Sequence, residues 1–237
     1  MQDFTSTFGN SASEALPAQR AQFIRKTYLL LAAAILGFIV TEAFLFASGA
    51  AELIATVIFS GGMIGWLVVL GLFMFVSYIA RTWATSETSK GTQILGLVLA
   101  VIAEAVIFVP LLTIAALRAD DPVVLLLKAG TVTIGLFLGI SATVFITRSD
   151  FSFLGPILAI GGFAALGFIV ASALFGFTLG NVFAFVMVAF AGTAILYETS
   201  NVLHRFNTNQ HVAASLTLFA SIALLFWYIL TIFSSRD

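Results

Sequence analysis

Seven long apolar segments constrain the fold of this chain more than any other feature of its sequence. A helix that crosses the hydrocarbon core of a bilayer needs roughly 20 mostly apolar residues. Polar residues divide the chain into runs of that kind, and we expect spanning helices at Thr27–Ala47, Ile54–Ala80, Gln93–Leu117, Val123–Thr147, Phe151–Phe175, Thr178–Thr199 and His211–Phe233. The alternating apolar and polar decads of an outer-membrane β-barrel do not appear. The sequence therefore predicts an all-α polytopic membrane protein, a bundle of seven transmembrane helices.

The distribution of basic residues predicts how this bundle is oriented. With the amino terminus inside, seven Lys and Arg residues fall in cytoplasmic segments and three fall outside. The positive-inside rule then places the amino terminus in the cytoplasm and the carboxyl terminus outside the cell membrane. Residues 1–26 are polar and lack the apolar core of a signal peptide, so we expect a mobile cytoplasmic tail followed by a transmembrane domain at residues 27–233.

Composition excludes several other classes of protein. Hydrophobic residues make up 61% of the chain and charged residues 9%, whereas ordinary soluble domains carry about 25% charged residues. The basic residues are too few and too scattered to form the stripe that nucleic acid requires, so the lipid bilayer is an expected partner and nucleic acid is not. The chain has no cysteine, which excludes thiolate catalysis and zinc–thiolate sites.

The residues of the common membrane enzymes and cofactor sites are missing. Both histidines, His204 and His211, flank one predicted loop, and every aspartate lies outside the predicted spans. Serine, aspartyl and zinc intramembrane proteolysis therefore lack their residues, and no phosphate-binding loop for ATP is present. The last span holds no lysine for a retinal Schiff base. We expect no enzymatic activity, no cofactor and no resident metal ion.

Three carboxyl groups lie within the predicted spans, those of Glu42, Glu104 and Glu198. A charge at the centre of a spanning helix costs roughly 2.5 to 3.5 kcal/mol on insertion scales, so such residues tend to face the bundle interior and to carry function. Glu42 lies near the end of its span, where a structural or interfacial role is expected. Glu104 lies near the centre of the third span, and its sequence context supports function and structure equally. If it faces the interior, it should reach polar groups on the sixth or seventh helix.

Small residues recur at spacings that permit close approach of helices. They include Gly61 and Gly65 in the second span, Gly135 and Gly139 in the fourth, and Gly161 in the fifth. The ordinary interpretation is packing in a compact bundle, and the pattern indicates no more specific function.

Two segments resemble the Bax inhibitor-1 family, also called the transmembrane Bax inhibitor motif family, and its bacterial YccA-like branch. One is "FLGISATVFITRSDFSFLGPIL", Phe137 to Leu158, and the other is "ILYETSNVLHRFNTNQHVAASLTLFASIALLFWYILTIF", Ile195 to Phe233. The resemblance implies a bundle in which six helices surround the seventh. It also implies a pair of aspartates, on the sixth and seventh helices, that shares a proton and is coupled to a calcium leak. Two carboxylates at close range cannot both ionise cheaply, so such a pair senses pH.

Carried over by position, the first family aspartate falls on Glu198 and the second on Ser221. A serine cannot share a titrating proton, although its hydroxyl can hydrogen-bond a carboxyl group. If the sixth helix continues through Leu203, then Glu198 and Asn201 share a face, with Ser221 or Thr217 as the partner across the interface. Otherwise Glu198 is an ordinary carboxylate at a helix end.

Two functions remain open from the sequence. Glu104, Glu198, Asn201 and Ser221 are the candidate proton-sensing or ion-pathway residues of a pH-sensitive cation leak, with calcium as the expected ion. The missing second aspartate and the polar tail instead favour a non-transporting modulator of membrane-protein quality control. The resemblance implies that such a modulator acts on the FtsH protease at the bacterial inner membrane.

Overall fold

The computed structural model describes residues 11–86 and 89–235, and this part of the chain is helical except for its short connections and one isolated backbone bridge, between Ser11 and Asn207. In chain order the helices are α1 (Pro17–Ala47), α2 (Ala50–Ser60), α3 (Gly62–Ala84), α4 (Lys90–Arg118), α5 (Pro122–Thr147), α6 (Leu154–Phe175), α7 (Gly180–His204) and α8 (His211–Ser234). All except α2 are long and apolar enough to cross a membrane. The predicted polytopic bundle of seven spanning helices is confirmed.

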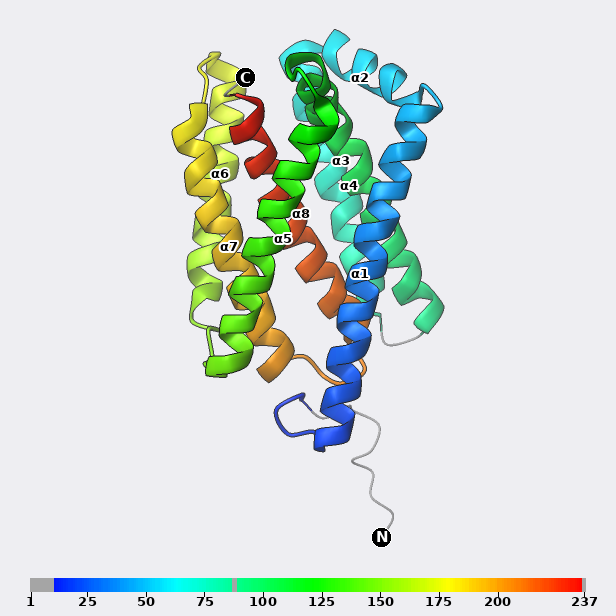
Figure 1. The fold of residues 1–237 in the computed structure, drawn as a ribbon, viewed down its shortest axis with the longest axis vertical. Helices are drawn as coiled ribbons and strands as arrows, with labels where there is room; N and C mark the ends of the chain where they lie inside the picture. Colours follow the sequence, from blue (N-terminus) through cyan, green and yellow to red (C-terminus); the bar gives the residue numbers. More distant parts are fainter. Residues whose placement is uncertain (1–10, 87–88, 236–237) are drawn as a thin grey trace.

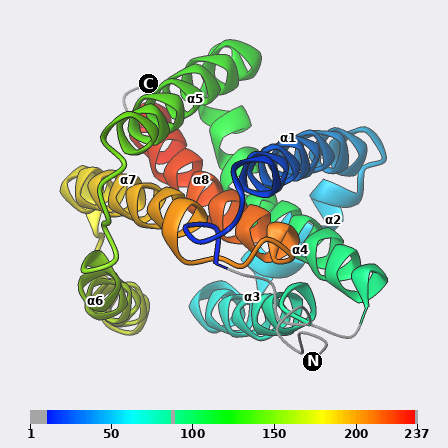
Figure 2. The ribbon, with the colours of Figure 1, turned by 90° about the horizontal axis from the view of Figure 1, so that it is seen from below.

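Helix α8 lies at the centre of the bundle (Figures 1 and 2). It packs against α7, α1, α4, α5 and α3, whereas α6 packs mainly against α7. Buried residues make up 61% of the apolar stretch of α8, the largest share of any spanning helix. The central position expected for the last helix is therefore present, but α6 lies outside α7 and takes little part in the ring around α8.

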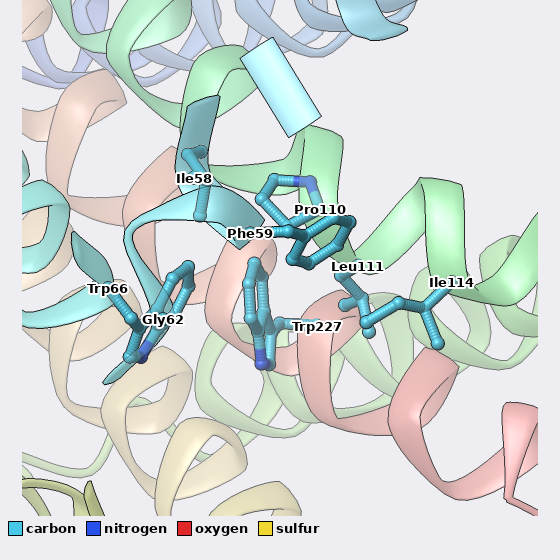
Figure 3. A pocket seen from close by; sticks show the side chains of 8 residues that line it. All are labelled: Ile58, Phe59, Gly62, Trp66, Pro110, Leu111, Ile114 and Trp227. Carbon is cyan, nitrogen blue, oxygen red and sulfur yellow. The ribbon is translucent and has the colours of Figure 1, made fainter. Parts of the chain in front are cut away.

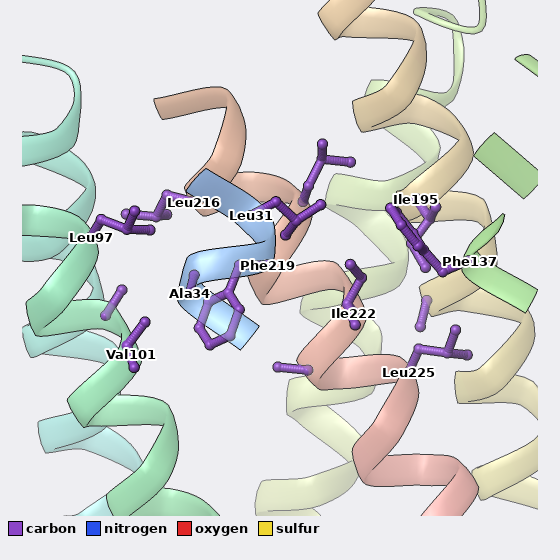
Figure 4. Close-up of a cluster of buried hydrophobic side chains, with 14 of the residues drawn as sticks. Leu31, Ala34, Leu97, Val101, Phe137, Ile195, Leu216, Phe219, Ile222 and Leu225 are labelled. Carbon is purple, nitrogen blue, oxygen red and sulfur yellow. The ribbon is translucent and has the colours of Figure 1, made fainter. Parts of the chain in front are cut away.

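The core forms where α8 meets α1, α4, α5 and α7. Figure 4 shows side chains from all five helices meeting there, among them Leu31, Val101, Phe137, Ile195 and Phe219. A buried hydroxyl also joins two helices, because Ser215 of α8 donates to the carbonyl oxygen of Thr27 in α1 over 2.9 Å. The outer surface is apolar as well: Phe163 is 79% exposed. Such a surface suits lipid, where apolar side chains gain by facing outward.

Local signals in the sequence set the helix ends around α5. The Asp121 side chain accepts hydrogen bonds from the backbone N–H groups of Val123 (2.9 Å) and Val124 (3.1 Å), and Pro122 occupies the first turn. An acidic N-cap followed by proline is a strong start signal for a helix. Helix α5 ends at Thr147, and its C-cap residue Arg148 has a left-handed backbone with φ of 52°. The connection to α6 is consequently short and well defined.

The second predicted span, Ile54–Ala80, is wrong in its boundaries. The chain breaks at Gly62, which has φ of 54°, a conformation that glycine adopts without steric cost. The short helix α2 precedes this break and lies inclined across one end of the bundle (Figure 1). Its Ala51 and Ala55 belong to a buried cluster with Val109 of α4. Continuous hydropathy concealed the break, because α2 and α3 are both apolar.

The helix that carries the first span begins before residue 27, where the transmembrane domain is predicted to start. Helix α1 begins at Pro17, since polar and basic residues continue a helix beyond the bilayer as readily as apolar ones. The segment before it is packed: Ala12 is fully buried, and its N–H donates to the carbonyl oxygen of Phe206 over 2.9 Å. Residues 1–10 of the predicted tail lie outside the described part of the chain.

The start of α1 and the end of α8 lie at opposite ends of the bundle (Figure 1), and the direction in which the bundle is inserted gives a testable prediction. Seven of the ten Lys and Arg residues lie at the end where α1 begins, so this end should face the cytoplasm. A reporter fused after Asp237 is expected to behave as external, and one inserted between α3 and α4 as cytoplasmic. Two reporters on the same side would contradict the bundle of seven spans.

Candidate functional site

Glu198 lies on the face of α7 that is turned toward the central helix. Its carboxyl group accepts a hydrogen bond from the Asn201 side chain over 3.4 Å and contacts the hydroxyl of Thr217 on α8. Helix α7 continues to His204, which places Glu198 between one and two turns from its end. The interior position, the shared face with Asn201 and the partner Thr217 agree with the expectation for a continuous sixth span.

The Ser221 side chain makes its hydrogen bond within its own helix. Its hydroxyl donates to the backbone carbonyl of Thr217 in the preceding turn of α8 over 3.1 Å. Among the described residues, Glu198 is instead joined to α8 by Thr217. The structure brings Glu198 and Asn201 together. Ser221 lies one turn farther along α8 than Thr217.

The end of α7 also holds buried hydroxyl groups. Ser200 is fully buried, and its hydroxyl accepts a hydrogen bond from the backbone N–H of Phe151 over 2.9 Å. Thr199, also fully buried, lies 3.4 Å from the hydroxyl of Ser141 on α5. These contacts join the two sequence segments that carry the family resemblance. The "TRSDF" turn after α5 and the "YETSN" end of α7 therefore form one structural unit.

A tyrosine that the sequence pattern does not single out completes this unit. Tyr28 of α1 places its hydroxyl beside the Ser141 and Thr199 pair, although that hydroxyl makes no well-formed hydrogen bond within the described residues. Its ring packs against Phe145, with 5.7 Å between the ring centroids. Tyr28 could be found from the sequence only by knowing that α1 and α5 are neighbours.

Glu104 is half-buried on α4, and its charged neighbour is Arg81 near the end of α3. This differs from the expectation that it would reach polar groups on α7 or α8: within the described residues no hydrogen bond joins it to either helix. The guanidinium of Arg81 also acts electrostatically on Glu198. In the sequence, Arg81 is only one of the basic residues that set orientation. The feature of the sequence that could have indicated these interactions is the length of the arginine side chain, which near a helix end can extend along the bundle.

Glu42 is more deeply enclosed than expected. It is 7% exposed, and neither carboxyl oxygen has a hydrogen-bond partner within the described residues. A residue near the end of a spanning helix can usually reach water, but α2 folds back over this end of α1 and packs against it. The turn between α1 and α2, where Gly49 has φ of 76°, sets α2 against this end of α1.

A separate cavity lies far from Glu198 and has no polar side chain to bind an ion. Its volume is about 290 Å³ (Figure 3), and it is lined by Ile58, Phe59, Gly62, Trp66, Pro110, Leu111, Ile114 and Trp227. Residues 11–86 and 89–235 also contain no cluster of three or more His, Asp or Glu side chains able to hold a metal ion.

Comparison with known proteins shows where this arrangement belongs. The family model described as "Inhibitor of apoptosis-promoting Bax1" matches residues 20–237, which is most of the chain and includes both motif segments and all three carboxyl groups. The chain belongs to the Bax inhibitor-1 family. It is a multi-pass membrane protein of that family.

Individual relatives of the Bax inhibitor-1 family match shorter stretches. An uncharacterised protein of Pseudomonas aeruginosa is 37% identical over 109 residues, 45% of this chain and 48% of that protein. The modulator of FtsH protease YccA of Escherichia coli is 36% identical over 105 residues, 43% and 48% respectively. Bax inhibitor 1 of Schizosaccharomyces pombe is 31% identical over 115 residues, 46% and 41%. The chain is thus aligned with about half the length of these curated relatives.

Proposed function

We propose that this protein is a slow cation leak whose opening depends on pH, and that Glu198 is its proton sensor. The observation that supports this most directly is the position of Glu198 at the interface between α7 and the central helix. There its carboxyl group contacts Thr217 and Asn201. A change in its charge would alter contacts that hold α7 against α8, and α8 packs against most of the bundle.

The placement of the other carboxyl groups supports a path for cations. Glu198 lies less than two turns from one end of α7, Glu104 about four turns into α4 from the same side, and Glu42 less than two turns from the far end of α1. All three helices pack against α8. Carboxyl groups inside a membrane typically mark ion pathways or proton relays. We propose that a cation, calcium first among the candidates, passes these groups in turn.

The proposed proton sensor differs from a shared pair of carboxyl groups. Among the described residues, the groups that act on the Glu198 carboxyl are Thr217, Asn201 and Arg81, with no second acid among them, so its ionisation depends on burial, on hydrogen bonds and on Arg81. The Thr217 hydroxyl can serve both forms, because a hydroxyl group is a donor and an acceptor. The pH response should therefore follow one titrating group rather than a coupled pair.

Flux into vesicles tests the proposal. Purified full-length protein is reconstituted into liposomes that contain a calcium-sensitive dye, and calcium entry is compared with protein-free liposomes between about pH 6 and pH 8, a range in which buried carboxyl groups can titrate. We expect entry above the protein-free rate that changes with pH. Entry equal to that of empty liposomes at every pH would contradict the leak.

The second proposed function is modulation of a membrane-bound protease of the FtsH type. One observation favours it: the similarity to the YccA modulator covers 43% of this chain. The polar tail proposed to bind the protease includes packed or helical residues, namely Ala12 and the residues from Pro17 onward. Deletion of residues 1–10 should then reduce association with the protease and lengthen the lifetime of the protein. Unchanged association and lifetime would remove this role.

Both proposed functions place the protein in the bacterial inner membrane with its amino terminus in the cytoplasm and without enzymatic activity. The curated relatives from Escherichia coli include one described as an inner membrane protein. The concentration of basic residues at the end where α1 begins supports the same direction of insertion.

A further inference from the structure

A second cavity lies where the segment before α1 meets the ends of α5 and α7. Its volume is about 440 Å³, within the range of about 300 to 1,000 Å³ that is typical of small-molecule sites. Figure 2 shows the segment before α1 lying under the connection between α7 and α8, where Ser13 donates to the carbonyl oxygen of His204 over 3.2 Å. Residues that precede the membrane-spanning part of α1 therefore line one side of the cavity.

The cavity combines two arginines with an apolar wall. Arg20 and Arg148 line it, and Ile24, Phe145 and Leu203 supply the apolar side. Arg20 is half-buried and makes one long hydrogen bond, 3.4 Å to the carbonyl oxygen of Leu203. Within the described residues, no hydrogen bond or ion pair engages the Arg148 guanidinium. Most of the donors of both side chains therefore remain available to a bound anion.

Neighbouring groups reinforce the positive character of the cavity. Helix α1 starts beside it with Leu16 as its N-cap, which offers no side-chain acceptor, and its first turn holds no acidic residue. The positive end of the helix dipole is therefore left uncompensated. The nearest carboxylates along the chain, Glu14 and Asp150, do not line the cavity. Hydrogen bonds from Ser152 lower the pKa of Asp150, so that carboxylate is already engaged within its own turn.

The backbone at Arg148 adds an independent observation. Its φ of 52° lies in the left-handed region, which is sterically unfavourable for a residue other than glycine. Glycine would hold the same turn without that cost. The turn therefore places an arginine, rather than the glycine that its backbone favours, at the edge of the cavity.

We propose that this cavity binds the phosphate headgroup of an anionic phospholipid from the adjacent leaflet. The two guanidinium groups match the charge of a phosphodiester, because planar arginine donors pair well with phosphate oxygens. The apolar wall of Ile24, Phe145 and Leu203 accepts the first carbons of the acyl chains. The site lies at the basic end of the bundle, and basic pockets between spanning helices at this depth suit anionic headgroups.

Native mass spectrometry of the full-length protein in detergent tests this with phosphatidylglycerol and phosphatidylcholine as probes. We expect preferential binding of phosphatidylglycerol and a loss of about fivefold in affinity for each arginine replaced by glutamine, or about 25-fold for the Arg20→Gln/Arg148→Gln double variant. The matched control is Arg25→Gln, an exposed arginine of α1 outside the cavity, with less than about a twofold change expected.

Two further measurements distinguish a lipid headgroup from free phosphate, and lipid binding by Arg148 from a purely structural role in its turn. Millimolar inorganic phosphate should fail to displace phosphatidylglycerol; full displacement would identify a site for soluble phosphate and overturn the lipid assignment. Arg148→Gly removes the charge and relieves the left-handed backbone, so it should weaken lipid binding without lowering the melting temperature in neutral lipid. Any of three results would overturn the proposal. These are equal affinity for the two lipids, equal losses in Arg25→Gln and the double variant, and full binding by Arg148→Gly.

Discussion

Replacement of Glu198 by glutamine is expected to abolish the pH dependence of cation flux while the fold remains intact. Glutamine keeps the shape of the side chain and its hydrogen bonds to Asn201 and Thr217, but it cannot ionise. In liposomes the ratio of calcium entry at about pH 6 to entry at about pH 8 should fall to about one. The absolute rate then reports which charge state keeps α7 and α8 together.

The matched control for this variant is Glu52→Gln, because Glu52 is an exposed glutamate on α2. It removes the same chemical group at a position that no spanning helix encloses, so its pH profile should match that of the wild type. Wild-type pH dependence in Glu198→Gln would show that Glu198 is only a carboxylate near a helix end. An equal effect of Glu52→Gln would place the response outside the α7–α8 interface.

The largest expected loss of stability comes from Gly96→Ala. A Cβ atom at this position would lie 2.6 Å from the carbonyl oxygen of Ala80 and 2.6 Å from the backbone nitrogen of Ala84. Both are backbone atoms of α3, so the helices would have to separate, and overpacking of this kind costs about 1 to 3 kcal/mol. The expected result is a lower melting temperature for the purified protein, measured by intrinsic tryptophan fluorescence.

Gly139→Ala provides the comparison for Gly96→Ala. A Cβ atom at Gly139 would meet no atom within 4 Å, and alanine is a better helix former than glycine. Its melting temperature should equal or exceed that of the wild type. A Gly96→Ala protein as stable as the wild type would show that α3 and α4 do not approach closely at this point.

These glycines illustrate what sequence patterns can and cannot predict. The small-residue spacing singled out Gly135 and Gly139, yet both face open space. The close contact between α3 and α4 instead depends on Gly96, which belongs to none of the selected pairs. Spacing within one helix says that a close approach is permitted, whereas the contact itself depends on which helices become neighbours.

The number of spans could be predicted because it depends on local hydropathy, whereas the predicted sixth span ends at Thr199 and α7 continues to His204. Hydropathy over about 20 residues identifies a helix that can cross a bilayer, and the apolar Val202 and Leu203 allow α7 to continue past Glu198. The break at Gly62 could not be predicted, since a single positive φ leaves no trace in the hydropathy of its neighbours.

The sequence predicts which residues of α7 form the candidate site better than it predicts which residues of other helices contact them. Glu198 and Asn201 share a face because of helical spacing, which the sequence alone gives. Arg81 and Tyr28 come from α3 and α1, and only the packing of distant segments brings them close. The same reason explains why Thr217 rather than Ser221 meets Glu198: the register between α7 and α8 is a property of the fold.

Infrared difference spectroscopy of the reconstituted protein after a pH step tests the central claim most directly, namely that Glu198 changes its ionisation at the α7–α8 interface as the leak responds to pH. A protonated carboxyl group has a C=O stretching band that a carboxylate lacks. The account predicts such a band in the wild type that changes with pH together with calcium flux and is missing from Glu198→Gln. An identical pH-dependent carboxyl band in the wild type and in Glu198→Gln would contradict it.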